Sequence, residues 1–258
     1  MMKQREHGAN LKRLYCSILW LVLNASFIPA IAISCPSARA DFPVNMVPAH
    51  PQLSEPSENS PAVKAGFQFE KQDKRVRIGL DGKSIVDFVF RDDKILRPYF
   101  ANAKLLNGLQ VTRNHPPVKG VDQPDHANMH PGIWLAFGDI NGFDFWRNKA
   151  KIEHVRFVKA PAVVEGRLKF ATECQLKDKQ DLSFCRMTNE YTLASRPHGW
   201  LLIWSAEFQA DNVAVTFGDQ EEMGFGARMA TPFIEKNGGI IRSSTGRTSA
   251  KKTWGQPA

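Results

Sequence analysis

Hydrophobic and polar residues alternate with a period of two at the start of the chain's main apolar region. Val76, Ile78 and Leu80 are separated by Arg77 and Gly79, Asp81-Gly82 follows, and apolar residues return over 85–90. An Asp-Gly pair between two such runs is typical of a two-residue β-turn. This segment therefore predicts a β-hairpin.

Similar short apolar runs, bounded by turn-forming residues, continue to the end of the chain. No window shows an apolar stripe of helical period and helical length, so we predict strands throughout. Many short strands at close spacing favour an all-β fold, an antiparallel β-sandwich formed by a single domain over residues 66–258. The further strand candidates are 94–100, 105–112, 133–137, 152–158, 163–175, 182–193, 200–209, 213–217 and 240–243. Trp200 and Trp204 share one face of their strand and are expected in the core.

The first 40 residues have the pattern of a secretory signal peptide. Residues 1–13 carry four basic residues and one acidic residue, an apolar run follows over 14–33, and Ser37-Ala38-Arg39-Ala40 supplies a small-x-small cleavage site. We therefore predict cleavage before Asp41 and a periplasmic or secreted protein with no later membrane span. An uncleaved membrane anchor and a lipoprotein attached through Cys35 are the alternatives. The Pro- and Ser-rich segment 41–65 is expected to be a disordered leader.

Charge and cysteine content agree with export. The chain has 34 Lys+Arg and 26 Asp+Glu, of which residues 1–40 hold five and one, so 29 basic and 25 acidic residues remain. The remaining positive charge is scattered, which disfavours a nucleic-acid-binding protein. Cys174 and Cys185 lie on the two arms of a predicted hairpin. They form either a disulfide or two small buried apolar side chains.

The segment 125–146 concentrates the side chains that bind metals, move protons or grip polyols. Asp125, His126 and His130 open it, with an H-x3-H spacing in a loop interrupted by Pro131 and Gly132. The two histidines are candidates for a metal pair or for general acid–base catalysis, with Asp125 beside them. Alternatively, they are loop histidines that hydrogen-bond to the backbone.

Two tryptophans and an aspartate follow in the same segment. Trp134 and Trp146 are candidates for stacking on a sugar ring, and Asp139 for binding its hydroxyl groups. The alternative role for Asp139 is an Asx-turn that caps Asn141-Gly142.

A second group of candidates lies over residues 219–228. Glu222 and Arg228 are interpreted as an acid–base pair or ligand clamp, or else as part of a solvated acidic turn. Arg97 and Arg113 are candidates for pinning an anionic group, and His115 is expected at the surface. The chain has no Gly-x-Ser-x-Gly, Walker, paired CxxC or HExxH motif, which disfavours the familiar hydrolase, NTPase and zinc-protein mechanisms.

Four of these motifs together resemble one family of exported bacterial proteins, often labelled "methane oxygenase PmoA" or PmoA-like. They are Arg97-Pro98-Tyr99, Val111-Thr112-Arg113, the block 125–146 and the block 217–228. The resemblance implies an exported β-sandwich that accompanies sugar oxidoreductases and glycan-degrading systems. Family members often have Asp-His-Pro-His-His, whereas this chain has one histidine fewer in a longer segment. Relatives also continue through further strands past Trp254-Gly255, so the resemblance implies a C-terminally truncated member with an incomplete sandwich.

We therefore expect an exported protein that acts on or binds a carbohydrate-like small molecule or glycan. Trp134 and Trp146 would stack on the sugar, His126 and His130 would serve as acid–base groups or metal ligands, and Glu222 with Arg228 would complete the polar wall. The sequence does not choose between hydrolase, lyase and epimerase. The alternatives are a non-catalytic carbohydrate-binding module and a metal-dependent oxygenase, whose divalent metal would be held by His126, His130 and a carboxylate.

Overall fold

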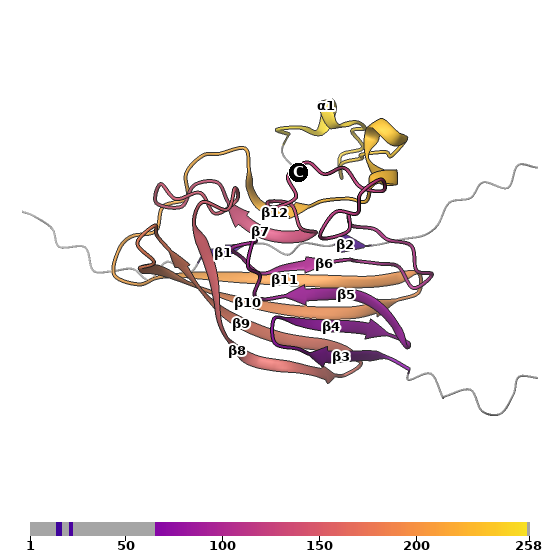
Figure 1. The fold of residues 1–258 in the computed structure, drawn as a ribbon, viewed down its shortest axis with the longest axis horizontal. Helices are drawn as coiled ribbons and strands as arrows, with labels where there is room; N and C mark the ends of the chain where they lie inside the picture. The colour runs from indigo at the N-terminus through magenta and orange to yellow at the C-terminus, as the bar shows by residue number, and fades with distance from the viewer. Residues whose placement is uncertain (1–13, 17–20, 23–64, 257–258) are drawn as a thin grey trace, which may run out of the picture.

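The computed structural model describes residues 14–16, 21–22 and 65–256. Two antiparallel six-stranded sheets pack against each other, with the long strands of one behind the short strands of the other (Figure 1). The described residues include one short α-helix, α1 (Ala250–Thr253), and two 3-10 turns, η1 (Thr231–Phe233) and η2 (Glu235–Asn237). The prediction of an all-β sandwich is confirmed.

The first sheet is built from long strands that follow one another along the chain. Its order is β1 (Leu14–Cys16), β11 (Gly199–Ala210), β10 (Ser183–Arg196), β9 (Arg167–Lys177) and β8 (Lys151–Val164), and β2 (Leu21–Val22) also pairs with β11. β8 forms the outer edge of this sheet. Its pairing with β9 is interrupted by three register shifts, between residues 154 and 162.

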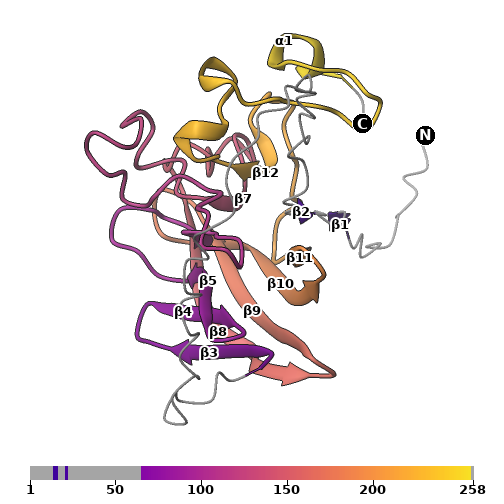
Figure 2. The ribbon, with the colours of Figure 1, turned by 90° about the vertical axis from the view of Figure 1, so that its right-hand side faces the viewer.

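The second sheet consists of shorter strands. Its order is β12 (Met223–Ala227), β7 (Ile133–Phe137), β6 (Tyr99–Ala101), β5 (Lys83–Val89), β4 (Arg75–Leu80) and β3 (Phe67–Lys71). Only β12 departs from the chain order, because the last strand returns to pair with β7. This pairing brings the sequence block 217–228 beside the block 125–146 (Figure 2).

Aromatic side chains join the two sheets. Phe88 of β5 lies 5.1 Å from Phe170 of β9 and 4.9 Å from Tyr191 of β10, between ring centroids. Phe100 of β6 lies 5.6 Å from Trp204 of β11. All five side chains are buried, so the alternation seen in the sequence produces a large aromatic core. The predicted burial of Trp204, and of Trp200, is confirmed.

Two hairpins have the tight turns that their residues favour. Asp81-Gly82 joins β4 to β5, and Glu165-Gly166 joins β8 to β9, with all four residues at positive φ. Positive φ at both central positions defines the turn whose twist matches antiparallel strands. The hairpin predicted at Asp81-Gly82 is therefore confirmed.

Several predicted strands differ from the observed ones. The candidate 94–100 shortens to β6, while 105–112, 213–217 and 240–243 form only isolated bridges. The candidate 163–175 is divided by the Glu165-Gly166 turn. β3 and β12 were not predicted, and β12 contains Gly224 and Gly226, which have low strand propensity.

The structure leaves both cysteines as free, buried thiols, so the disulfide prediction is wrong and the alternative of two small buried side chains holds. The strand register explains this result. Cys174 pairs with Met187 and Cys185 pairs with Leu176, so the two cysteines are diagonal rather than direct neighbours. Diagonal Cα atoms lie about 7–8 Å apart, too far for a relaxed disulfide.

The proposed signal peptide and the leader lie almost entirely outside the described residues. β1 and β2 fall within the signal segment, and cleavage after Ala40 would leave β11 at the edge of its sheet. In the described part of the chain, none of the helices has the length and apolar character needed to cross a bilayer.

Candidate functional site

Residues 121–131, which we call the His126 loop, lie in the long connection between β6 and β7 and have no regular secondary structure. Arg113 holds this loop from beneath. Its side chain is 1% exposed, and its guanidinium donates to the carbonyl oxygens of Gln123 at 2.8 Å, Asp125 at 2.7 Å and His130 at 3.0 Å. A planar fork of donors suits several carbonyl groups at once, so one buried side chain fixes both ends of the loop.

Arg97 is a second buried arginine with a similar function. It donates to the carbonyl oxygens of Phe145 at 3.1 Å and Trp146 at 3.0 Å, and also to that of Met129 in the His126 loop. Burial lowers the pKa of Arg97 to about 10, so the group remains a cation at neutral pH. Arg97 and Arg113 therefore bind backbone carbonyl groups, rather than the anionic ligand that the sequence suggested.

The loop presents Asp125 and His126 to solvent. Asp125 accepts two hydrogen bonds of 2.7 Å from Arg228, and the Asp125 and His126 side chains are 43% and 53% exposed. Partial burial acts to raise the pKa of Asp125, but Arg228, Arg113 and His126 together outweigh it and lower that pKa. Asp125 is therefore a carboxylate at neutral pH. It cannot act there as a proton donor.

His126 has an unusual backbone conformation. Its φ is +51°, in the left-handed region that side chains other than glycine rarely adopt. Its Nδ1 lies 3.4 Å from a carboxylate oxygen of Asp125, and its ring centroid lies 5.1 Å from that of His130. Strained conformations of this kind concentrate at functional sites, where surrounding contacts hold them in place.

His130 and the two tryptophans form a stack behind the loop. The His130 ring lies parallel to Trp134, with centroids 4.9 Å apart, and Trp134 meets Trp146 edge to face at 5.2 Å. Burial, followed by His126 and the nearby arginines, lowers the pKa of His130 to about 4, so it is neutral at pH 7. The tryptophans are only 2% and 9% exposed, so in this structure they support His130 and do not offer a face to a sugar.

Gly226 of β12 completes this packing. It pairs with Trp134, and a Cβ on residue 226 would overlap the indole ring. The next residues of the same strand place Arg228 beside Asp125. Gly226 and Arg228, two residues apart in the sequence, thus have separate physical roles in one site.

Glu222 and Asp139 do not belong to this cluster. Glu222 forms an ion pair with Arg147, at the end of β12 opposite Arg228, so the predicted Glu222–Arg228 clamp is not formed. Asp139 accepts a hydrogen bond of 2.7 Å from the Gly142 amide, which is the Asx-turn that we considered as its alternative role.

The metal hypothesis fits these residues poorly. No group of three or more His, Cys, Asp or Glu side chains in the described part of the chain is arranged to hold a metal ion. His126 and His130 supply two imidazoles, but the neighbouring carboxylate of Asp125 is engaged by Arg228. The three-ligand set expected for an oxygenase is therefore not present around these histidines.

A family model described as a family of unknown function, DUF6807, matches residues 75–258. The chain belongs to this family. Every residue of the His126 loop, together with Arg97, Arg113 and Arg228, lies within the DUF6807 range. No curated protein and no solved structure matches the chain.

The DUF6807 domain also has a cleft of about 220 Å³ beside the His126 loop, which the sequence analysis did not identify. Ala127 and Asn128 of the loop line it together with Asp92, Tyr99 and His115. Tyr99 donates a hydrogen bond of 2.6 Å to Asp92. Tyr99 belongs to the sequence motif 97–99, but we treated only Arg97 of that motif as a candidate site residue.

His115 is half-buried in this cleft rather than placed at the open surface as expected. Its ring meets Tyr99 edge to face at 5.3 Å between centroids. Burial is the main reason that the pKa of His115 is lowered, so at neutral pH it is an uncharged hydrogen-bonding group in the cleft wall.

Proposed function

We propose that this DUF6807 protein is exported and binds a carbohydrate-derived ligand at the surface formed by Asp125, His126 and Arg228. The observation that carries the proposal is the anchoring of the His126 loop. Arg97 and Arg113 are buried, and their guanidinium groups donate hydrogen bonds to carbonyl oxygens of this loop and of the neighbouring segment. Such support holds a polar group in one geometry before the ligand arrives, which reduces the entropy lost on binding.

The chemistry of these three groups suits a hydroxyl-rich ligand. Asp125 offers carboxylate lone pairs, Arg228 offers guanidinium donors, and the imidazole of His126 offers one donor and one acceptor when neutral. Neighbouring hydroxyl groups of a sugar each donate and accept, so they match this alternation. The cleft that starts at Ala127 extends the surface with Asn102 and Asp92, two further polar side chains.

The N-terminal pattern supports export of the protein. A basic segment, an apolar run and Ala38-Arg39-Ala40 precede the domain, and both cysteines of the domain are buried. The motif resemblance to exported proteins that accompany glycan-degrading systems supports the same ligand class.

A second candidate function is general acid–base catalysis on the same ligand, with His126 as the proton-transfer group. The 3.4 Å separation between His126 Nδ1 and Asp125 favours it, because a fixed carboxylate orients an imidazole. Asp125 would act as the orienting group and not as the proton donor.

Titration calorimetry of the full chain against neutral and acidic mono- and oligosaccharides tests the proposal. Asp125→Asn and His126→Ala are expected to weaken the binding of the best ligand about tenfold or more, because the first replaces a charged acceptor oxygen by an NH2 donor and the second removes the imidazole. His198→Ala is the matched control, since His198 is also exposed but lies on the distant turn between β10 and β11.

Two results would overturn the proposal. One is a well-folded protein, judged by near-ultraviolet circular dichroism, that binds no saccharide of the panel at millimolar concentration. The other is equal binding by Asp125→Asn, His126→Ala and His198→Ala. Turnover of a bound saccharide that His126→Ala abolishes, with binding retained, would establish the catalytic candidate.

A further inference from the structure

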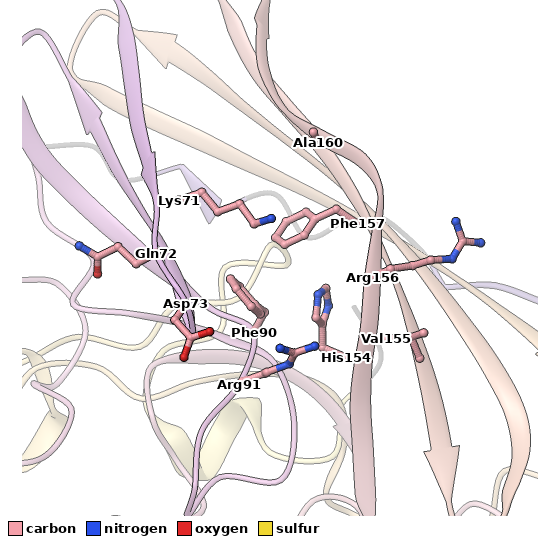
Figure 3. Close-up of a pocket in the computed structure, with 10 residues that line it drawn as sticks. All are labelled: Lys71, Gln72, Asp73, Phe90, Arg91, His154, Val155, Arg156, Phe157 and Ala160. Atoms are coloured by element: carbon pink, nitrogen blue, oxygen red, sulfur yellow. The ribbon is translucent and has the colours of Figure 1, made fainter.

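A larger cleft lies where the edge strands of the two sheets, β3 and β8, face each other. Its volume is about 510 Å³, within the range of small-molecule sites. Lys71 at the end of β3, the segment Phe90-Arg91 after β5, and residues 154–157 and 160 of β8 line it (Figure 3). We call it the edge cleft.

The floor of the edge cleft is aromatic. Phe90 and Phe157 meet edge to face at 5.2 Å between centroids, and the His154 ring lies 4.8 Å from Phe90 and 5.0 Å from Phe157. His154 and Phe90 are buried, and Phe157 is partly exposed toward the cleft. Packing against Phe90 and His154 holds the Phe157 ring in place, so the cleft has a rigid aromatic side chain against which another flat ring fits.

Two cations stand over this floor. Lys71 Nζ lies 4.9 Å from the Phe157 centroid, and Arg91 Cζ lies 5.9 Å from the Phe90 centroid. Neither forms an ion pair within the part of the chain that the structure describes. After burial, Arg91 and Lys71 are the causes that lower the pKa of His154 to about 4, so both charges act on the cleft floor.

The other charged residues of the edge cleft are arranged differently. Arg156 is paired with Glu173 at 2.9 Å and points away from the cavity in Figure 3. Asp73 lies on the turn after β3 and is the one acidic residue among the described lining residues. Two unpaired cations and one carboxylate leave a single net positive charge, which matches a monoanion better than a polyanion.

The irregular geometry of β8 is what opens this space. Its register with β9 shifts between His154 and Arg156 and again between Phe157 and Lys159. A β-bulge adds a residue and redirects the side chains beside it, and bulges are frequent next to binding sites. Here the shifts allow both His154 and Phe157 to face the cleft while Val155 and Arg156 point outward, as Figure 3 shows.

We propose that the edge cleft binds an aromatic carboxylate, with its ring against Phe157, the partly exposed ring of the floor, and its carboxylate between Lys71 and Arg91. The apolar floor supplies the area of contact, and the two cations supply the charge-assisted hydrogen bonds that fix the orientation. This site is separate from the saccharide surface at Asp125, and neither proposal depends on the other.

The test measures the affinity of the full chain for two probes, benzoate and 2-naphthoate, by NMR or titration calorimetry. Naphthoate should bind more tightly than benzoate because it covers more of the floor. Lys71→Gln combined with Arg91→Gln should weaken naphthoate binding about tenfold or more. Lys159→Gln is the matched control, because Lys159 is also exposed on β8 but pairs with Glu190 at 2.8 Å. It should change the affinity less than about twofold.

Two ligand controls separate charge from contact area. Benzyl alcohol keeps the ring without the charge, and inorganic phosphate keeps negative charge without the ring, so both should bind at least about tenfold more weakly. Affinity for phosphate equal to that for naphthoate would overturn the proposal, as would equal binding of naphthoate by the double variant and Lys159→Gln. Phe157→Leu keeps both cations and should weaken naphthoate more than phosphate; an equal loss for both would also contradict it.

Discussion

Replacement of Arg113 by methionine should release the His126 loop from the domain. Arg113 is buried beneath the loop and donates to three carbonyl groups, those of Gln123, Asp125 and His130. Methionine has a similar length and an apolar character, so it fills much of the space but provides no donor. The three carbonyl oxygens then either stay without a hydrogen-bond partner or reorient to accept hydrogen bonds from water. In the second case the loop moves.

The magnitude follows from those contacts. A hydrogen bond from a charged donor contributes about 1.5–3 kcal/mol, but three bonds to one side chain are coupled and do not add in full. Removing the guanidinium also relieves the cost of burying its charge, which is the main reason that the pKa of Arg113 is lowered. We therefore expect the free energy of unfolding to fall by about 3–5 kcal/mol. The decrease is smaller if the loop becomes hydrated while the rest of the domain stays folded.

Hydrogen exchange and urea unfolding together measure this effect. The amides of Met129 and His130 donate to the His126 carbonyl within the loop, so their exchange should accelerate strongly in Arg113→Met. Arg196→Met is the control, because Arg196 is exposed and its guanidinium donates to the carbonyl of the neighbouring Ser195. Unchanged protection of Met129 and His130, with a stability loss below about 0.5 kcal/mol, would refute the anchoring role.

Three further predictions concern the core. The pKa of His154 is about 4 in the folded state, below its ordinary value, so the unfolded chain takes up a proton first as the pH falls. The stability that this group contributes is present above about pH 6.5 and is lost toward pH 4, and the loss is at most about 3 kcal/mol. In urea unfolding, the free energy of unfolding of His154→Phe should therefore depend less steeply on pH. Gly226→Ala should lower thermal stability by about 2 kcal/mol or more because its methyl overlaps Trp134; an unchanged melting temperature would contradict this packing. Burial raises the pKa of Cys174 and Cys185 to about 12, so a thiol reagent should modify both only after unfolding. If these two cysteines stay unmodified in denaturant, they are instead joined in a disulfide.

The sequence was sufficient for the fold class because period-two alternation and turn residues act locally. The Asp81-Gly82 hairpin and the burial of Trp204 follow from residues close together in the chain. β12 was not predicted because the contact that favours this strand is not local in the sequence. Gly226 is poor in an isolated strand but fits beside Trp134, a neighbour about ninety residues away in the chain.

The same distinction applies to the candidate site. Asp125 and His126 could be identified from their residue types and spacing, and the structure brings Arg228 beside them. The sequence could not show whether a polar side chain faces solvent or the protein interior. Arg113 and Trp134 have functional chemistry but are buried, and their partners are backbone carbonyl groups and neighbouring rings that no motif records.

The most direct test of the central claim is an NMR titration of the isotope-labelled full chain with the tightest-binding saccharide of the panel. The account predicts that the largest shifts fall on the backbone amides of the non-proline residues in 121–131 and on the side chain of Arg228, and that Asp125→Asn reduces them at equal ligand concentration. Saturable shifts confined to another face, with the His126 loop unaffected, would contradict the claim that this loop forms the binding site.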